Sequence, residues 1–299
     1  MVEIFLQILL PIFLLIGLGS LLDRAFTLDL GTLSKMSFYA FVPALVFIEL
    51  QGSEVAGRLL LSIAAVILVH LLLLAAVAWL VFNRRWIGEN RSVPRVGSIF
   101  YNAGNFGIPL AQLFFGSTGV AVMAVILMVQ NFMSFTLGIA MLARDSRGEK
   151  GASAASLAAL AKVPVLWAIV LALVLPEMQG PVIDAASYLA DGLIPVVLMT
   201  LGIQLGRCRF HGHAVQVGLV TGIRLVLSPL LMGGLLLLWP YPLENYEAIL
   251  LVAAGLPVAV NTHLLALEYK VDPEVAAQQV FWTTLLGGLS ITLLLYLVS

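Results

Sequence analysis

One apolar run of this chain contains a stretch that a membrane helix cannot pass through unbroken. The run extends from Val93 to Phe115. Its centre holds Gly104, Gly107 and Pro109. Glycine weakens a helix, and proline removes a backbone donor and clashes with the carbonyl four residues earlier. Unpaired backbone groups survive in a bilayer only where protein or a wet cavity surrounds them. The stretch therefore predicts a broken helix that lines a cavity.

The composition supports a membrane setting for this break. Of the 299 residues, 61% are hydrophobic and 10% are charged, and the mean hydropathy is +1.07. A soluble domain of this length is less apolar. The formal net charge of -1 gives no electrostatic basis for binding nucleic acid. Cys208 is the single cysteine, which excludes an internal disulfide and a cysteine-based metal site.

Apolar runs that can each cross about 30 Å of hydrocarbon predict an all-α polytopic membrane protein with ten transmembrane helices. The predicted spans are 4–22, 30–49, 58–82, 93–115, 118–142, 156–176, 182–206, 214–239, 246–268 and 274–298. The first follows Glu3 and no basic residue, so we expect a membrane helix there and not a signal peptide.

The basic residues predict the orientation of the chain. Lys and Arg concentrate in or beside the connections that follow odd-numbered spans, whereas Arg58 stands alone on the opposite side. Because cytoplasmic connections retain positive charge, both termini are expected to face outward. The predicted location is the bacterial inner (plasma) membrane.

The two halves of the chain resemble each other at a shift of about half its length. Prolines occupy matching spans in three pairs: Pro11 with Pro164, Pro43 with Pro195, and Pro109 with Pro257. Five spans per half is an odd number, so residues 1–150 and 151–299 are predicted to be inverted five-helix repeats. Inverted repeats with interrupted spans in matching positions are typical of secondary transporters whose site lies between two broken helices.

The residues at the breaks also resemble a known family, the auxin efflux carriers, which include plant PIN-type carriers and bacterial relatives. Asn102 to Pro109 is similar to that family's Asn-x-Gly-Asn-x-Gly-x-Pro signature, and Gly255 to Asn261 resembles its second crossover. Further similar segments are Lys162-Val163-Pro164, Leu193 to Gly206, and Arg224 to Pro229.

This resemblance implies an architecture like that of the bile-acid sodium symporters. Broken helices 4 and 9 would cross at their prolines. Helices 1, 2, 6 and 7 would form a scaffold that can form a homodimer, and helices 3–5 with 8–10 would form a moving transport domain. Plant members have a long loop between helices 5 and 6, whereas Arg144 to Ser153 is short here. Regulation through that loop is therefore not expected.

Three asparagines at the breaks are predicted to bind the substrate: Asn102, Asn105 and Asn261. Their amides can donate to a carboxylate, and the N-termini of the half-helices add partial positive charge. The alternative is that they only cap the broken backbone. The same predicted binding site includes residues expected to shape it more than to contact the ligand: Gly107, Pro109 and Pro257.

Other polar residues within the spans are predicted to bind the substrate or a coupling ion. They are His70, Gln130, Asn131, Arg224, His263, Gln278 and Gln279. The amides can coordinate Na+ or simply hold helices together, and a histidine can carry H+ or act as a structural donor. Arg224 can attract an anion, bind backbone carbonyls or extend to the surface. No cofactor is expected beyond Na+ or H+, and no other metal site is predicted.

The predicted function is secondary active transport of a small organic anion, such as a mono- or dicarboxylate, by an elevator-like alternating-access mechanism. Among family members, bacterial relatives suggest malate or malonate, and plant relatives suggest aromatic acids. The alternatives are a sodium-coupled symporter of a larger amphipathic acid, or a channel or uniporter. We do not expect an enzyme, because the spans lack a nucleophile motif and a deep pair of acids. A sodium/proton antiporter would also need such a pair.

Overall fold

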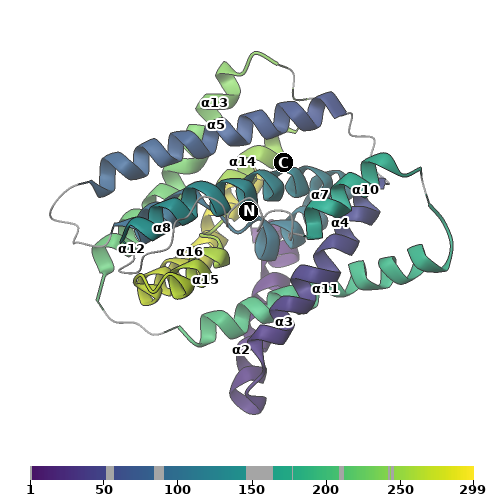
Figure 1. Ribbon diagram of the computed structural model, residues 1–299, viewed down its shortest axis with the longest axis horizontal. Coiled ribbons are helices and arrows are strands. Elements are labelled where there is room, and N and C mark those ends of the chain that lie inside the picture. Colours follow the sequence, from purple (N-terminus) through teal and green to yellow (C-terminus); the bar gives the residue numbers. More distant parts are fainter. Residues whose placement is uncertain are drawn as a thin grey trace.

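The computed structural model describes residues 2–51, 57–83, 91–145, 164–176, 178–208, 212–241, 243 and 246–299. Throughout these residues the chain is helical and has no β-strand (Figure 1). The predicted boundary between the halves, at residues 150 and 151, and the beginning of the sixth span lie outside the described residues. The same holds for the basic residues at 84–85, 147–162 and 209.

The first half forms a series of helices that in places contain a single π-helical turn. They are α1 (Val2–Ile4), η1 (Phe5–Leu9), α2 (Leu10–Phe26), α3 (Leu30–Met36), η2 (Ser37–Phe41), α4 (Val42–Gln51), α5 (Gly57–Phe82), α6 (Ser92–Ile99), η4 (Ala103–Gly107), α7 (Ile108–Met133), η5 (Ser134–Gly138) and α8 (Ile139–Asp145).

The second half is also built from long and short helices. They are α10 (Pro164–Val174), α11 (Pro181–Gly206), α12 (Ala214–Gly222), η6 (Ile223–Leu227), α13 (Ser228–Leu238), α14 (Glu247–Ala254), α15 (Val260–Glu268) and α16 (Pro273–Val298).

Seven continuous helical segments of the described chain are long and apolar enough to cross a membrane, and α10 is a shorter apolar helix. One of the seven, Ala103–Asp145, has 43 residues, which at about 1.5 Å per residue is too long for one crossing. Its backbone departs from the helix at Gly116, with φ 64° and ψ −153°. This is where the sequence predicted the end of the fourth span. The division into ten spans and two inverted repeats stays a prediction.

Two groups of helices surround the middle of the protein. In the α11 group, α2, α3 and α4 pack against α11, and α10 packs against α4. The other group contains two interrupted helices whose breaks lie side by side, and we call it the crossing group. In it, α5 packs on α6, α7 and α13, while α16 contacts α6, α12, α14 and α15. In Figure 1, α2, α3 and α11 lie in the lower part of the molecule, and α5 with α13 lies along the upper edge. The groups meet where α4 contacts α7 and where α11 contacts η4.

The α2–α11 contact in the α11 group is close because small residues face it. A Cβ atom on Gly19 would collide with the backbone of Met199, and a Cβ atom on Gly202 would collide with the backbone of Ile16. Close backbone approach at small residues is a common way of packing helices inside membranes. At one end of this pair, the Arg207 guanidinium forms an ion pair with Asp23.

Candidate functional site

Two helices of the crossing group are interrupted, and their extended segments pair with each other. After α6, residues Phe100 to Asn102 run antiparallel to residues Pro257 to Ala259, with an isolated bridge between Tyr101 and Val258. The Asn102 N–H donates to the Pro257 carbonyl at 2.8 Å, and the Ala259 N–H donates to the Phe100 carbonyl at 3.0 Å. Each break thus supplies backbone partners that the other has lost, as a membrane interior requires.

Side chains from two further helices bind the N–H groups of the bridged residues. The Tyr101 N–H donates to Gln130 Oε1 of α7 at 2.9 Å. The Val258 N–H donates to Thr283 Oγ1 of α16 at 3.0 Å. The crossing is therefore fixed from both sides by amide and hydroxyl oxygens.

Arg224 lies beside the crossing and donates to carbonyls at the ends of the interrupted helices. Its side chain is fully buried. One terminal nitrogen donates to the carbonyls of Ala254 at 2.8 Å and Leu256 at 3.1 Å. The other donates to Ser228 Oγ at 3.1 Å and to the Ser98 carbonyl at 3.5 Å. The guanidinium carbon lies 4.7 Å from the centre of the Tyr101 ring. The cation thus compensates the partial negative charge at these helix ends.

His70 contacts Ser228, which also accepts a hydrogen bond from Arg224. Its Nε2 atom lies 3.1 Å from the Ser228 carbonyl and 3.3 Å from Ser228 Oγ, and the ring is fully buried. His70 and Arg224 thus share Ser228 as a partner in the interior of the crossing group.

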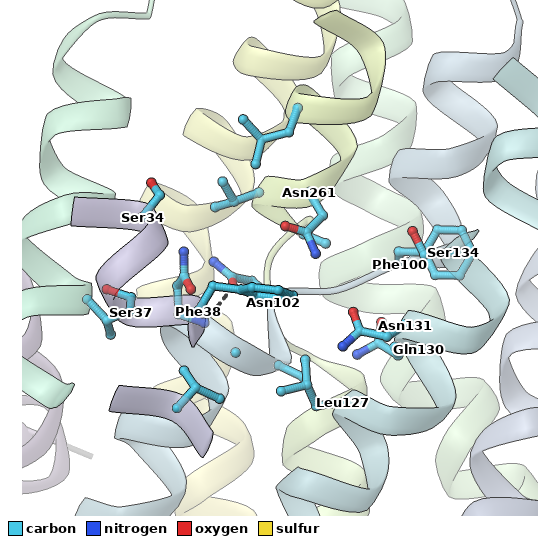
Figure 2. Close-up of a pocket in the computed structure, with 18 of the residues that line it drawn as sticks. Ser34, Ser37, Phe38, Phe100, Asn102, Leu127, Gln130, Asn131, Ser134 and Asn261 are labelled. Carbon is cyan, nitrogen blue, oxygen red and sulfur yellow. Dashed lines mark hydrogen bonds between the residues drawn. The ribbon is translucent and has the colours of Figure 1, made fainter. Parts of the chain in front are cut away.

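A cavity of about 350 Å³ is lined by residues of the crossing, among them Tyr101 and Asn102. It is bounded by the crossing, by α7 and α15, and by α3, η2 and α11 of the α11 group. Its polar lining residues are Ser34, Lys35, Ser37, Tyr39, Tyr101, Asn102, Asn105, Gln130, Asn131, Ser134, Thr200, Gln204, Asn261 and Glu268. In Figure 2, Ser34 and Ser37 lie across from Gln130 and Asn131, with Asn102 between them.

Two buried amides of this cavity have their orientation fixed by backbone N–H groups. The Asn102 side-chain oxygen accepts from the Asn105 N–H at 3.0 Å. The Gln130 side-chain oxygen accepts from the Tyr101 N–H. Both residues are 4% exposed, and neither Asn102 Nδ2 nor Gln130 Nε2 has a hydrogen-bond partner within the described part of the protein. Each amide therefore has an unused donor end and an occupied acceptor end.

The structure brings together five of the residues that the sequence predicted for the site. Asn102, Asn105, Gln130, Asn131 and Asn261 all line this cavity, from η4, α7, α15 and the connection before η4. Asn102 also caps η4 through its side chain, so its predicted capping role and its place in the cavity coexist.

Other predicted residues do not line the cavity. Pro109 lies buried near the start of α7, and Pro257 accepts the Asn102 N–H within the crossing. A Cβ atom on Gly107 would lie 2.8 Å from Leu256 and 3.0 Å from Met123, so glycine permits close packing there. Gly107 and Pro257 thus bond to Asn102 of the crossing, whereas a shaping role for Pro109 stays a prediction.

The remaining predicted residues lie elsewhere in the crossing group. Arg224 donates to backbone carbonyls next to the crossing, and His70 contacts Ser228, a partner of Arg224. His263 Nδ1 lies 3.0 Å from the Pro273 carbonyl. Gln278 and Gln279 are buried in α16, and neither amide atom of Gln279 has a hydrogen-bond partner in the described chain.

Sequence reasoning missed the wall of the cavity that the α11 group provides. Ser34 and Lys35 of α3, Ser37 of η2, and Thr200 and Gln204 of α11 all line it. Ser34, Lys35 and Ser37 lie within four residues of one another in the predicted second span, which is the weak signal that the sequence offered.

These observations define a polytopic membrane protein with a polar cavity at the meeting point of two interrupted helices, which is the construction of a transporter. The chain matches the family described as membrane transport protein over residues 4–161 and 152–295, and it belongs to this family, which includes the auxin efflux carriers. It is therefore a membrane transport protein and not an enzyme.

Curated relatives cover nearly the whole chain. One, from Methanothermobacter thermautotrophicus, is named "Uncharacterized transporter"; it is 26% identical over 272 residues, which cover 89% of this chain and 88% of the relative. Another, from Rhizobium meliloti, is named "Putative malonate transporter"; it is 28% identical over 308 aligned positions, which cover 97% of this chain and 95% of the relative.

Proposed function

We propose that this protein is a secondary transporter that moves a small organic anion, a mono- or dicarboxylate, across the membrane by alternating access. The observation that carries the proposal is the pair of unused amide donors, Asn102 Nδ2 and Gln130 Nε2, in the wall of the cavity. A buried donor without an acceptor costs about 1–3 kcal/mol, and a carboxylate supplies the missing acceptors.

The N-terminus of α15 favours the same sign of ligand. α15 begins at Val260, which lines the cavity. The first N–H groups of a helix have no acceptor within it and carry partial positive charge, which stabilises an anion.

The orientation of the two fixed amides disfavours a sodium ion at their positions. Na+ needs oxygen ligands, and the side-chain oxygens of Asn102 and Gln130 already accept backbone N–H groups. The sodium-coupled alternative would have to place its ion on other oxygens. This observation favours an anion as the ligand of the cavity wall formed by these amides.

The cavity volume and the relatives limit the size of the ligand. A volume of about 350 Å³ lies near the lower end of small-molecule sites, which favours a short-chain acid over a large amphipathic one. The name of the Rhizobium meliloti relative refers to malonate, a three-carbon dicarboxylate. We therefore choose malonate as the first probe.

Alternating access requires the cavity to open in turn to each side. The cavity lies between the α11 group and the crossing group, so a displacement of one group against the other would change its exposure. We propose that the α11 group is the scaffold and that the crossing group carries the substrate. The proposed ten-helix inverted repeat would make two opposite arrangements of these groups similar in energy. Counterflow of labelled malonate in proteoliposomes is expected, whereas unitary currents would indicate a channel.

Replacing Asn105 and Asn261 together by alanine is expected to weaken malonate binding at least tenfold. Both side chains face the cavity, and each amide can donate one hydrogen bond to a carboxylate, worth about 1.5–3 kcal/mol for a charged acceptor. Malonate binding would be measured by isothermal titration and by the ligand-induced rise in melting temperature of purified protein.

The matched control for this double variant is Asn83→Ala, which removes an exposed asparagine outside the cavity. It should leave the dissociation constant unchanged. Equal malonate affinity in the wild type and in the double variant would refute the proposed site. Repeating the titration with and without Na+, and at two pH values, tests the coupling ion. A dissociation constant that depends on Na+ would identify Na+ as that ion.

A further inference from the structure

Lys35 is the only basic residue among the described residues that line the cavity. It lies in the last turn of α3, and its side chain is exposed. No carboxylate of the described residues lies within ion-pair distance of it. An ammonium group that lines a cavity with amide donors and forms no ion pair among the described residues is a second point of attraction for an anion.

The amide donors and Lys35 belong to different groups of helices around the cavity. Asn102 and Gln130 belong to the crossing group, whereas Lys35 is flanked by Ser34 and Ser37 on the wall that the α11 group provides. Figure 2 shows Ser34 and Ser37 across the cavity from Gln130 and Asn131. We call Asn102 and Gln130 the amide wall. A ligand with one carboxylate can accept hydrogen bonds from the amide wall and make no contact with Lys35. A ligand with a carboxylate at each end can bind both walls at once.

The acidic residues around Lys35 do not substitute for such a ligand. Asp29 caps the N-terminus of α3, where it accepts from the N–H groups of Gly31 and Thr32, both at 3.2 Å, and from the Thr32 hydroxyl. Glu268, at the end of α15, also lines the cavity. Its negative charge repels an anion, which directs a second carboxylate away from α15 and toward α3.

We propose that Lys35 recognises the second carboxylate of the substrate and thereby sets the preference for dicarboxylates over monocarboxylates. This inference rests on the proposed function, because it assumes that the first carboxylate binds the amide wall. A dicarboxylate held in this way connects the crossing group to the α11 group. Lys35 is then a specificity-determining residue that contacts the substrate directly.

The experiment compares malonate with malonamate, in which one carboxylate is replaced by a neutral amide on the same skeleton. Wild-type protein is expected to bind malonate about tenfold more tightly than malonamate, because an ion pair with Lys35 adds affinity that solvent screening keeps modest. Lys35→Gln should weaken malonate binding about tenfold and change malonamate binding less than about twofold. The preference for the diacid would then disappear.

Two further variants make the result specific. Lys35→Arg retains a cation and should keep most of the preference for malonate. Arg144→Gln removes an exposed cation from the last turn of α8, outside the cavity, and should bind both ligands as the wild type does. Melting temperatures without ligand show that each variant is folded.

The outcomes separate this inference from the proposed function. If the wild type binds malonate and Lys35→Gln binds it equally well, or loses affinity for malonate and malonamate to the same extent, Lys35 does not recognise the second carboxylate. The carboxylate site itself would survive that result. If wild-type protein binds neither malonate nor malonamate, both the inference and the choice of a small carboxylate are wrong.

Discussion

Replacing Arg224 by methionine is expected to cause a large loss of folded, monodisperse protein. Methionine fills similar volume but donates no hydrogen bonds. The carbonyls of Ser98 and Leu256 would then lose the donor that the structure gives them inside the crossing group. At about 1–3 kcal/mol for each buried acceptor left unpaired, the cost is roughly 2–6 kcal/mol. Because typical stabilities are about 5–15 kcal/mol, this is a major fraction of the total.

The loss at Arg224 should also affect the binding site, although the residue lies outside the cavity. The Ala254 and Leu256 carbonyls precede the extended segment that pairs with Asn102. Freeing these carbonyls removes a constraint on the segment and on the amide wall. The expected result is a lower melting temperature and weaker malonate binding in whatever protein remains folded.

The experiment on Arg224 compares three proteins by size-exclusion profile and melting temperature after extraction in mild detergent. Arg224→Lys should be intermediate, because an ammonium group cannot reproduce the forked contacts of the guanidinium or its stacking on Tyr101. Arg144→Met is the control, since Arg144 is exposed. A wild-type melting temperature for Arg224→Met would show that these carbonyls do not depend on the guanidinium.

The structure also shows what kind of site residue a sequence can reveal. The cavity asparagines could be predicted because a break in an apolar run is a local signal, readable from Gly104 and Pro109 alone. Gln130 could be proposed as a polar residue in a span. Which end of its amide is free depends on the Tyr101 N–H, a residue 29 positions earlier that only the folded chain brings near.

The wall formed by the α11 group was not predictable by the same reasoning. Lys35 lies close to the predicted end of a span, where a basic residue is usual and indicates orientation. Gln204 lies in an ordinary apolar helix. Only the packing of α3 and α11 beside the crossing makes these residues part of the cavity. For Arg224 the sequence left three roles open, and the contacts seen here are those with backbone carbonyls.

The boundaries of some helices could be predicted from the local sequence, whereas others depend on contacts in the folded chain. The predicted spans agree closely with α5, α11 and α16, because long apolar runs define helices by themselves. The sequence placed the fourth span at 93–115 with a break at Gly104 to Pro109. The extended break lies earlier, at Phe100 to Asn102, and the chain is helical again from Ala103 until it departs from the helix at Gly116. The extended conformation of Phe100 to Asn102 depends on pairing with the distant Pro257 to Ala259 segment.

Gly19→Ala is expected to destabilise the protein, whereas Gly17→Ala on the same helix is not. A methyl group at Gly19 would collide with the Met199 backbone, and a backbone cannot move aside as a flexible side chain can. Separating α2 from α11 should cost about 3 kcal/mol, and the gain in helix propensity of roughly 1 kcal/mol offsets only part of it.

The two glycines make a closely matched comparison. Nothing lies within 4 Å of a Cβ atom placed on Gly17, so alanine there should raise the melting temperature slightly through helix propensity alone. Gly202→Ala, on the other side of the contact, should lower the melting temperature as Gly19→Ala does, because its methyl group would meet the Ile16 backbone. Equal melting temperatures for Gly17→Ala and Gly19→Ala would show that α2 and α11 do not pack this closely. A lower melting temperature in Gly19→Ala and Gly202→Ala, but not in Gly17→Ala, would establish the α2–α11 contact as a rigid part of the α11 group. A scaffold requires such rigidity if the crossing group moves against it.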